Sequence, residues 1–138
     1  MHNTQIFFPL VAMAFWTFAI TLYMGRIRVR AVRNNEVKFS YFKLNQGSQV
    51  PERMSRVAQH YENLFEINSL FYIVVILMYT TQQTALLNIL FAWAYFATRV
   101  VHSIIHLGSN NVKTRFLFFV LSLVFLVTLW IIFLARII

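Results

Sequence analysis

The 138-residue sequence has no cysteine and no aspartate. Without cysteine the chain can form no disulfide, no thiolate metal site and no thiol nucleophile, so any sulfur chemistry has to arrive on a substrate. Charge is also scarce, because Asp, Glu, Lys and Arg make up 12% of the residues, against about 25% in soluble domains. Since 59% of the residues are hydrophobic, the composition is that of a membrane protein.

Four apolar runs cover residues 6–24, 64–79, 85–107 and 116–134. Three of them approach the roughly 20 residues that cross a hydrocarbon core, and the second extends backwards through a polar, protein-facing segment at 56–63. We therefore predict an all-α membrane protein, folded as a single four-helix transmembrane domain over residues 1–138. The expected helices cover residues 5–33, 52–79, 85–107 and 114–136.

Positive charge is distributed unequally among the connections. Residues 25–56 hold eight Lys and Arg side chains and the third connection adds Lys113 and Arg115, whereas residues 80–84 carry no charge. By the positive-inside rule the first and third connections face the cytoplasm and both termini face the other side. The charge follows the first apolar run instead of preceding it, unlike a cleaved signal peptide. We predict an integral multi-pass protein of a bacterial inner membrane.

The basic residues of the first connection have two possible functions. Arg26, Arg28 and Arg30 serve either as a topogenic signal that contacts anionic headgroups or as part of a binding site. Nucleic acid is not an expected partner, because the basic residues cluster at one membrane face without a recognisable nucleic-acid-binding motif. The polar stretch 34–51 is long enough to act as a lid or a binding loop.

Glu66 and Arg99 are ionisable residues inside stretches that otherwise read as membrane-spanning helix. A charge at that depth costs a few kcal/mol unless it has a partner or a function. At 1.5 Å per residue, Glu66 lies roughly 15 Å along its helix from Arg56, and Arg99 lies roughly 12 Å from Leu107. The depths match, so we predict a Glu66–Arg99 ion pair, which either locks two helices together or belongs to a ligand site.

The remaining polar residues exceed what a helix lock requires. Three- and four-residue spacing forms one polar stripe on the second helix (Arg56, Gln59, His60, Asn63, Glu66) and one on the third (Arg99, His102, Ser103, His106, Asn110). With Arg115, and with Arg28 and Arg30 nearby, these stripes predict a cationic cleft open to the cytoplasm. Such a cleft suits an anionic ligand with carboxylates, such as a small peptide.

A metal is the other ligand that the histidines allow. His102 and His106 are spaced four residues apart and could ligate a metal or a haem from one helix face. That spacing is common by chance, and only His60 on another helix could complete such a site, so no metal is expected. The aromatic residues are expected to face lipid and the membrane interfaces.

A family resemblance rests on three segments: Pro51-Glu52-Arg53, Asn63-Leu64-Phe65-Glu66 and the third-helix sequence RVVHSIIHLGSNNVKTR, which runs from Arg99 to Arg115. With the four-helix layout, the chain resembles the MAPEG family, the membrane-associated proteins in eicosanoid and glutathione metabolism. The resemblance implies a homotrimer that binds glutathione as co-substrate between subunits near the cytoplasmic face. The glutathione thiol would then attack a lipophilic electrophile or a peroxide.

The resemblance also implies roles for individual residues. Asn63 and Glu66 match the family's Asn-x-x-Glu, and Arg99 and His102 match its Arg-x-x-His. The glutathione-binding set would be Arg30, Arg56, Asn63, Glu66, Arg99, His102 and His106. Arg115 matches the arginine assigned to thiol activation: a thiol with a pKa of about 8.5 is mostly protonated at neutral pH, and an adjacent guanidinium stabilises the thiolate. The alternative for Arg115 is a topogenic interfacial charge.

Three positions differ from the family pattern. Gln59 replaces a common arginine, His106 replaces a tyrosine found in many members, and Phe119 replaces a tyrosine found in some. We therefore predict a glutathione-dependent membrane transferase or peroxidase, and these differences leave open an alternative function, in which the chain is a catalytically silent structural or lipid-binding subunit of a membrane complex.

Overall fold

The protein is an all-helical chain in the computed structural model, which describes residues 4–44 and 49–138. These residues form four α-helices, α1 (Phe7–Arg33), α2 (Glu52–Thr80), α3 (Leu86–Leu107) and α4 (Val112–Leu134). Two short 3-10 helices, Thr4–Ile6 and Phe39–Lys43, precede α1 and follow it. The described ranges contain no strand, and all four α-helices are long and apolar enough to cross a membrane. The predicted fold class is confirmed at this level.

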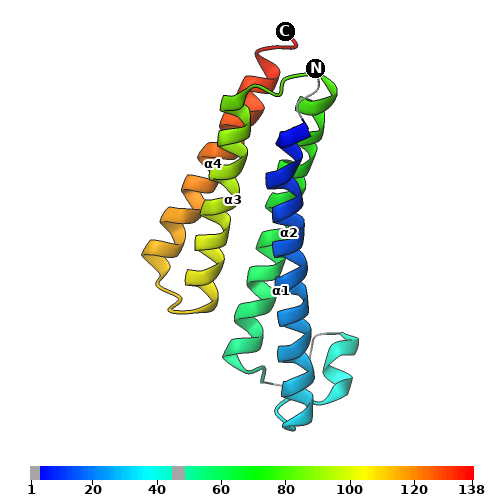
Figure 1. Ribbon diagram of the computed structural model, residues 1–138. Helices are drawn as coiled ribbons and strands as arrows, with labels where there is room; N and C mark the ends of the chain where they lie inside the picture. Colours follow the sequence, from blue (N-terminus) through cyan, green and yellow to red (C-terminus); the bar gives the residue numbers. More distant parts are fainter. Residues whose placement is uncertain (1–3, 45–48) are drawn as a thin grey trace.

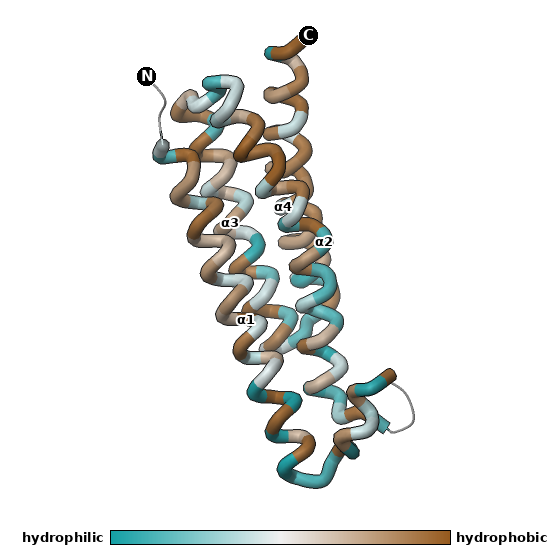
Figure 2. Tube along the Cα trace, turned by 90° about the vertical axis from the view of Figure 1, so that its right-hand side faces the viewer, coloured by the Kyte–Doolittle hydropathy of each residue, from teal (hydrophilic) through white to brown (hydrophobic). Residues whose placement is uncertain are grey.

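The helices pack as two antiparallel hairpins. Figure 1 shows α1 beside α2 and α3 beside α4, with the beginning of α1 and the end of the chain at the same end of the bundle. The α1–α2 hairpin extends well past the turn between α3 and α4, so the 3-10 helix Phe39–Lys43 after α1 lies beyond the second hairpin (Figure 1). Figure 2 shows hydrophilic residues gathering toward that end of the molecule. Polar side chains are therefore available for a site between α2 and the α3–α4 turn.

The apolar core fills the opposite half of the bundle. Its buried members come from every helix, and among the largest are Met13, Phe71, Met78 and Leu129, all fully buried. Because lipid is as apolar as these side chains, close packing and not water exclusion holds the helices here. The Phe71 and Tyr95 rings stack with their centres 4.3 Å apart, which fixes α2 against α3.

A hydrogen-bonded polar chain separates this core from the cytoplasm-facing half predicted by the charge pattern. Tyr95 on α3 donates to Asn68 Oδ1 on α2 at 2.8 Å, and Asn68 donates to Thr17 Oγ1 on α1 at 3.3 Å. About two turns further along α3, Ser103 accepts from the Trp16 indole at 3.1 Å. Since buried polar groups in a membrane need partners, these bonds set the rotation of α1, α2 and α3 about their axes.

The turn between α3 and α4 ends one helix sharply and begins the next. Gly108 permits this, because a Cβ there would lie 2.8 Å from the Ile104 carbonyl oxygen. Asn110 adopts a left-handed conformation with φ of 52°, and Asn111 caps α4 by accepting from the Thr114 amide. This cap explains why α4 begins at Val112, two residues before the expected start at 114.

Candidate functional site

A cavity of about 310 Å³ opens where α2 meets the α3–α4 turn. Its lining consists of Gln59 and Asn63 from α2, His102 and His106 from α3, and Val112, Arg115, Phe116 and Phe119 from α4. The lining thus combines amide, imidazole and guanidinium groups with apolar and aromatic surface. Four of the predicted site residues, Asn63, His102, His106 and Arg115, share this cavity.

Arg99 lies behind the cavity wall and is fully buried. Its Nη2 donates to the side-chain oxygen of Asn63 at 3.0 Å and to the Asn63 carbonyl at 3.3 Å. The guanidinium carbon lies 5.8 Å from the ring centre of Phe119, which lines the cavity. The ring face contributes a favourable cation–π contact, but no carboxylate neutralises the charge among the described residues. The site therefore holds a buried positive charge that favours an anionic ligand nearby.

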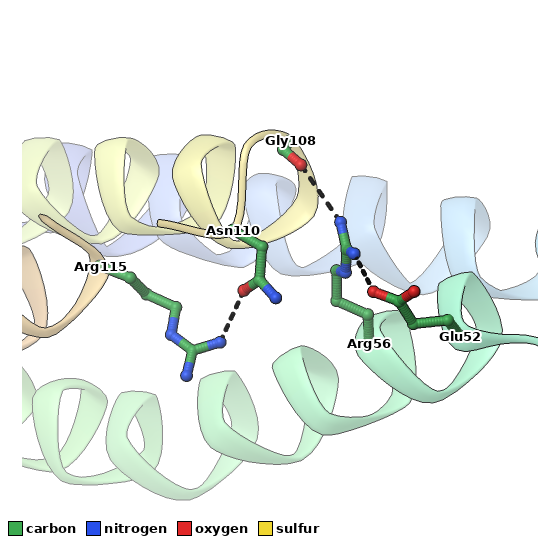
Figure 3. A network of polar contacts seen from close by, with 5 residues as sticks. All are labelled: Glu52, Arg56, Gly108, Asn110 and Arg115. Carbon is green, nitrogen blue, oxygen red and sulfur yellow. Dashed lines mark hydrogen bonds and ion pairs between the residues drawn. The ribbon is translucent and has the colours of Figure 1, made fainter. Parts of the chain in front are cut away.

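Arg56 and Arg115 approach the α3–α4 turn from opposite sides, as Figure 3 shows. Arg115 Nη1 donates to Asn110 Oδ1 at 2.8 Å, and Arg56 Nη1 donates to the Gly108 carbonyl at 3.2 Å. Arg56 also pairs with Glu52 one turn earlier, the single ion pair within 4–44 and 49–138. Arg56 lies in an adjacent groove that shares Gln59 with the cavity. The turn thus fixes both guanidinium groups at the cavity and its edge.

Three imidazoles lie together at the inner wall. His60, His102 and His106 are at most 4% exposed, and the His60 and His106 Nδ1 atoms are 3.2 Å apart. His102 Nδ1 donates to the Arg115 carbonyl at 2.9 Å. The Nε2 atoms of all three rings are buried without a hydrogen-bond partner in the described structure. An unsatisfied buried polar atom costs about 1–3 kcal/mol of folding free energy, so this cluster destabilises the helix bundle unless the three nitrogens have another function.

The predicted Glu66–Arg99 ion pair is wrong, because Arg99 bonds to Asn63 and the Glu66 side chain is exposed. The reason lies in helix geometry. Residues three apart differ by about 60° around an α-helix. A polar stripe at 60, 63 and 66 therefore rotates from buried His60 through half-buried Asn63 to exposed Glu66.

Arg30 does not line the cavity either. It lies on α1 in a separate groove with Asn34, Glu36 and Arg53, beneath the first connection. Arg28, also expected nearby, lies 5.8 Å from the Phe42 ring in that same projecting part of the molecule. The projection of the α1–α2 hairpin past the α3–α4 turn keeps both arginines away from the cavity within one chain (Figure 1).

His60 lies at this site although the sequence indicates no role for it in glutathione binding and suggests it only as a possible third metal ligand. The three- and four-residue spacing placed it on the polar stripe of α2, but spacing on one helix does not show what it faces. Its contact with His106 depends on the register between α2 and α3, which the Asn68–Tyr95 hydrogen bond helps to fix.

The fold and the cavity define a multi-pass membrane protein with a small cationic chamber at one end of a four-helix bundle. The sequence profile of the MAPEG family matches residues 6–135, nearly the whole chain. The chain therefore belongs to the MAPEG family. Neither a search of curated proteins nor a search of solved structures found a match.

Proposed function

We propose that the chain is a glutathione-dependent transferase or peroxidase of the membrane, acting on lipophilic electrophiles. Family membership supports a function of this class. The observation that carries the proposal is the cavity, whose lining combines Arg115 and two histidines with the aromatic rings of Phe116 and Phe119. A hydrophilic anionic peptide and a lipophilic molecule could meet there.

The chemistry follows from the charge. Arg115 would stabilise the glutathione thiolate, whose sulfur attacks an electrophilic carbon and forms a carbon–sulfur bond while the leaving group departs with the bonding electrons. With a peroxide, two glutathione molecules would supply two electrons and end as the disulfide, leaving an alcohol and water. Arg99, Asn63, His102 and His106 would position the peptide, with Arg56 at the edge.

The first test is the ultraviolet absorbance of the thiolate when glutathione is added to the purified protein in detergent. The proposal predicts a saturable rise at neutral pH and turnover with an aryl halide or a lipid hydroperoxide. The alternative is a catalytically silent structural or lipid-binding subunit of a membrane complex. It is kept open by Gln59, His106 and Phe119, which line the cavity and differ from the family pattern described above. An intact protein that shows neither a thiolate rise nor turnover would establish that alternative.

We also propose that the working unit is a homotrimer, and Glu66 supports this. Its side chain is exposed on a membrane-length helix, and the residues four and seven positions further on the same face, Leu70 and Ile73, are exposed and apolar. A carboxylate among lipid-facing side chains is expensive. A neighbouring copy of the chain would cover this face and give Glu66 a partner.

Replacing Glu66 with glutamine tests this assembly. We expect the Glu66→Gln variant to weaken subunit association by about 2 kcal/mol or more, because the partner charge would be left buried and unpaired. Native mass spectrometry or sedimentation in detergent measures the change, and glutathione affinity should fall with it. Glu36→Gln, which removes an exposed carboxylate from the first connection, is the matched control. If the distribution of oligomer masses is unchanged in Glu66→Gln, Glu66 does not contribute to the subunit interface.

The basic end of the bundle would face the cytoplasm of a bacterial inner membrane, where the positive-inside rule places it. The beginning of α1 and the end of α4 would then lie on the opposite side, consistent with their shared end of the bundle (Figure 1). In that orientation the cavity would face the cytoplasmic compartment and membrane lipids would surround the helices.

A further inference from the structure

His60, His102 and His106 form a compact triangle between α2 and α3. One ring nitrogen from each residue lies within 4.8 Å of the others, and the ring centres are 5.0 to 5.7 Å apart. All three side chains are more than nine-tenths buried. His60 comes from α2, and His102 and His106 are four residues apart on α3. Helix packing alone does not require three buried imidazoles whose nitrogens lack hydrogen-bond partners.

The hydrogen bonds identify free lone pairs in this triangle. His102 donates its Nδ1 proton to the Arg115 carbonyl, so its buried Nε2 carries the lone pair. The His60 and His106 Nδ1 atoms face each other at 3.2 Å, and one of them must be unprotonated for that contact to be a hydrogen bond. The cluster is thus a set of imidazole donors in the form that binds metals.

We propose that His60, His102 and His106 hold a divalent transition-metal ion of the zinc type. Two nitrogens bound to one tetrahedral zinc lie about 3.3 Å apart, and their ring centres lie about 5 Å apart. The His60–His106 pair has these separations already, at 3.2 and 5.0 Å. His102 would close the third side by side-chain rotation. Its bond to the Arg115 carbonyl is the backbone contact that commonly orients a metal-bound histidine.

The type of ion follows from the donors. Three neutral imidazoles suit zinc, copper, nickel or iron, whereas calcium and magnesium prefer oxygen ligands. The guanidinium groups of Arg99 and Arg115 lie near the cluster and oppose a bare cation, so the ion would carry an anionic fourth ligand. His102 and His106 also line the cavity, which places that fourth position within reach of an anion bound there. The inference goes beyond the proposed function, because metal binding is measured without glutathione.

Cobalt(II) is the probe that tests the site. The full-length protein in detergent is stripped with a chelator and titrated with Co²⁺, whose visible bands report a low-coordinate nitrogen site, and then with Zn²⁺, which should displace it. We expect one ion per chain in the wild type and an affinity at least about tenfold lower in His60→Gln and His106→Gln. A wild type that develops no visible bands would overturn the proposal.

The matched control is His2→Gln, which removes the remaining histidine and with it any metal binding at the chain's amino terminus. We expect this variant to bind Co²⁺ like the wild type. Bands that vanish in His2→Gln, or that persist at full affinity in both His60→Gln and His106→Gln, would overturn the site. Should the histidine variants fail to fold, X-ray absorption of the zinc-loaded wild type decides: three imidazole nitrogens support the proposal, and any other ligand set contradicts it.

Discussion

Replacing Arg115 with alanine should remove most of the thiolate that bound glutathione forms at neutral pH. Arg115 is the one guanidinium that lines the described cavity directly, and its bond to Asn110 holds it there. Lowering a thiol pKa by about two units requires about 2.7 kcal/mol, which one partly desolvated arginine can supply. At pH 7 a thiol pKa that returns from about 6.5 to about 8.5 lowers the thiolate fraction about 25-fold, and we expect the turnover rate to fall with it, measured by ultraviolet absorbance and by steady-state kinetics.

Lys113→Ala provides the matched control for that result. Lys113 is exposed in the same first turn of α4, so its removal changes the charge equally without touching the cavity. If Lys113→Ala reduces the thiolate as much as Arg115→Ala does, the thiolate is stabilised by the general positive potential of the surface and not by the position of the Arg115 guanidinium. Full thiolate formation in Arg115→Ala would exclude Arg115 as the activating group.

The second large effect concerns the buried charge of Arg99. Replacing Asn63 with leucine removes the side-chain oxygen that accepts from Arg99 at 3.0 Å and leaves the guanidinium with a weak carbonyl contact. Removing a hydrogen bond to a buried charged group costs about 1.5–3 kcal/mol. We therefore expect a strong decrease in the thermal unfolding midpoint of Asn63→Leu in detergent.

The double variant Asn63→Leu/Arg99→Met separates the charge from the packing. Removing both partners leaves no unpaired charge, and stability should return close to that of the wild type. Gln59→Leu, the same kind of change at an exposed position of the same helix and cavity, should cost little. A double variant as unstable as Asn63→Leu would show that Asn63 acts by packing and not by satisfying Arg99.

The helical architecture could be predicted from the sequence because each membrane-spanning helix requires a long run of apolar residues. Scarce charge and four such runs are enough to predict four spanning helices, and the predicted α2 extension through 56–63 is present. The cap at Asn111 and the turn at Gly108 set details that hydropathy cannot show.

The site was less predictable because it depends on how two helices are rotated against each other. The third-helix residues Arg99, Ser103 and His106 share one face and are all buried, as their spacing of four and three predicts. On α2, repeated steps of three turn the stripe outward, so Asn63 and not Glu66 meets Arg99. Glu66 and Arg99 lie at similar depths along their helices, but the angular position of each residue around α2 decides which one contacts Arg99.

The most direct measurement is calorimetric titration of the purified protein with glutathione and with glutathione esterified at both carboxylates. If the cavity binds the peptide through its guanidinium and imidazole groups, unmodified glutathione should bind in a saturable manner, and the diester should bind at least about tenfold more weakly. Equal affinity for the two compounds, or no heat of binding for glutathione, would contradict a cationic peptide site at the α3–α4 turn.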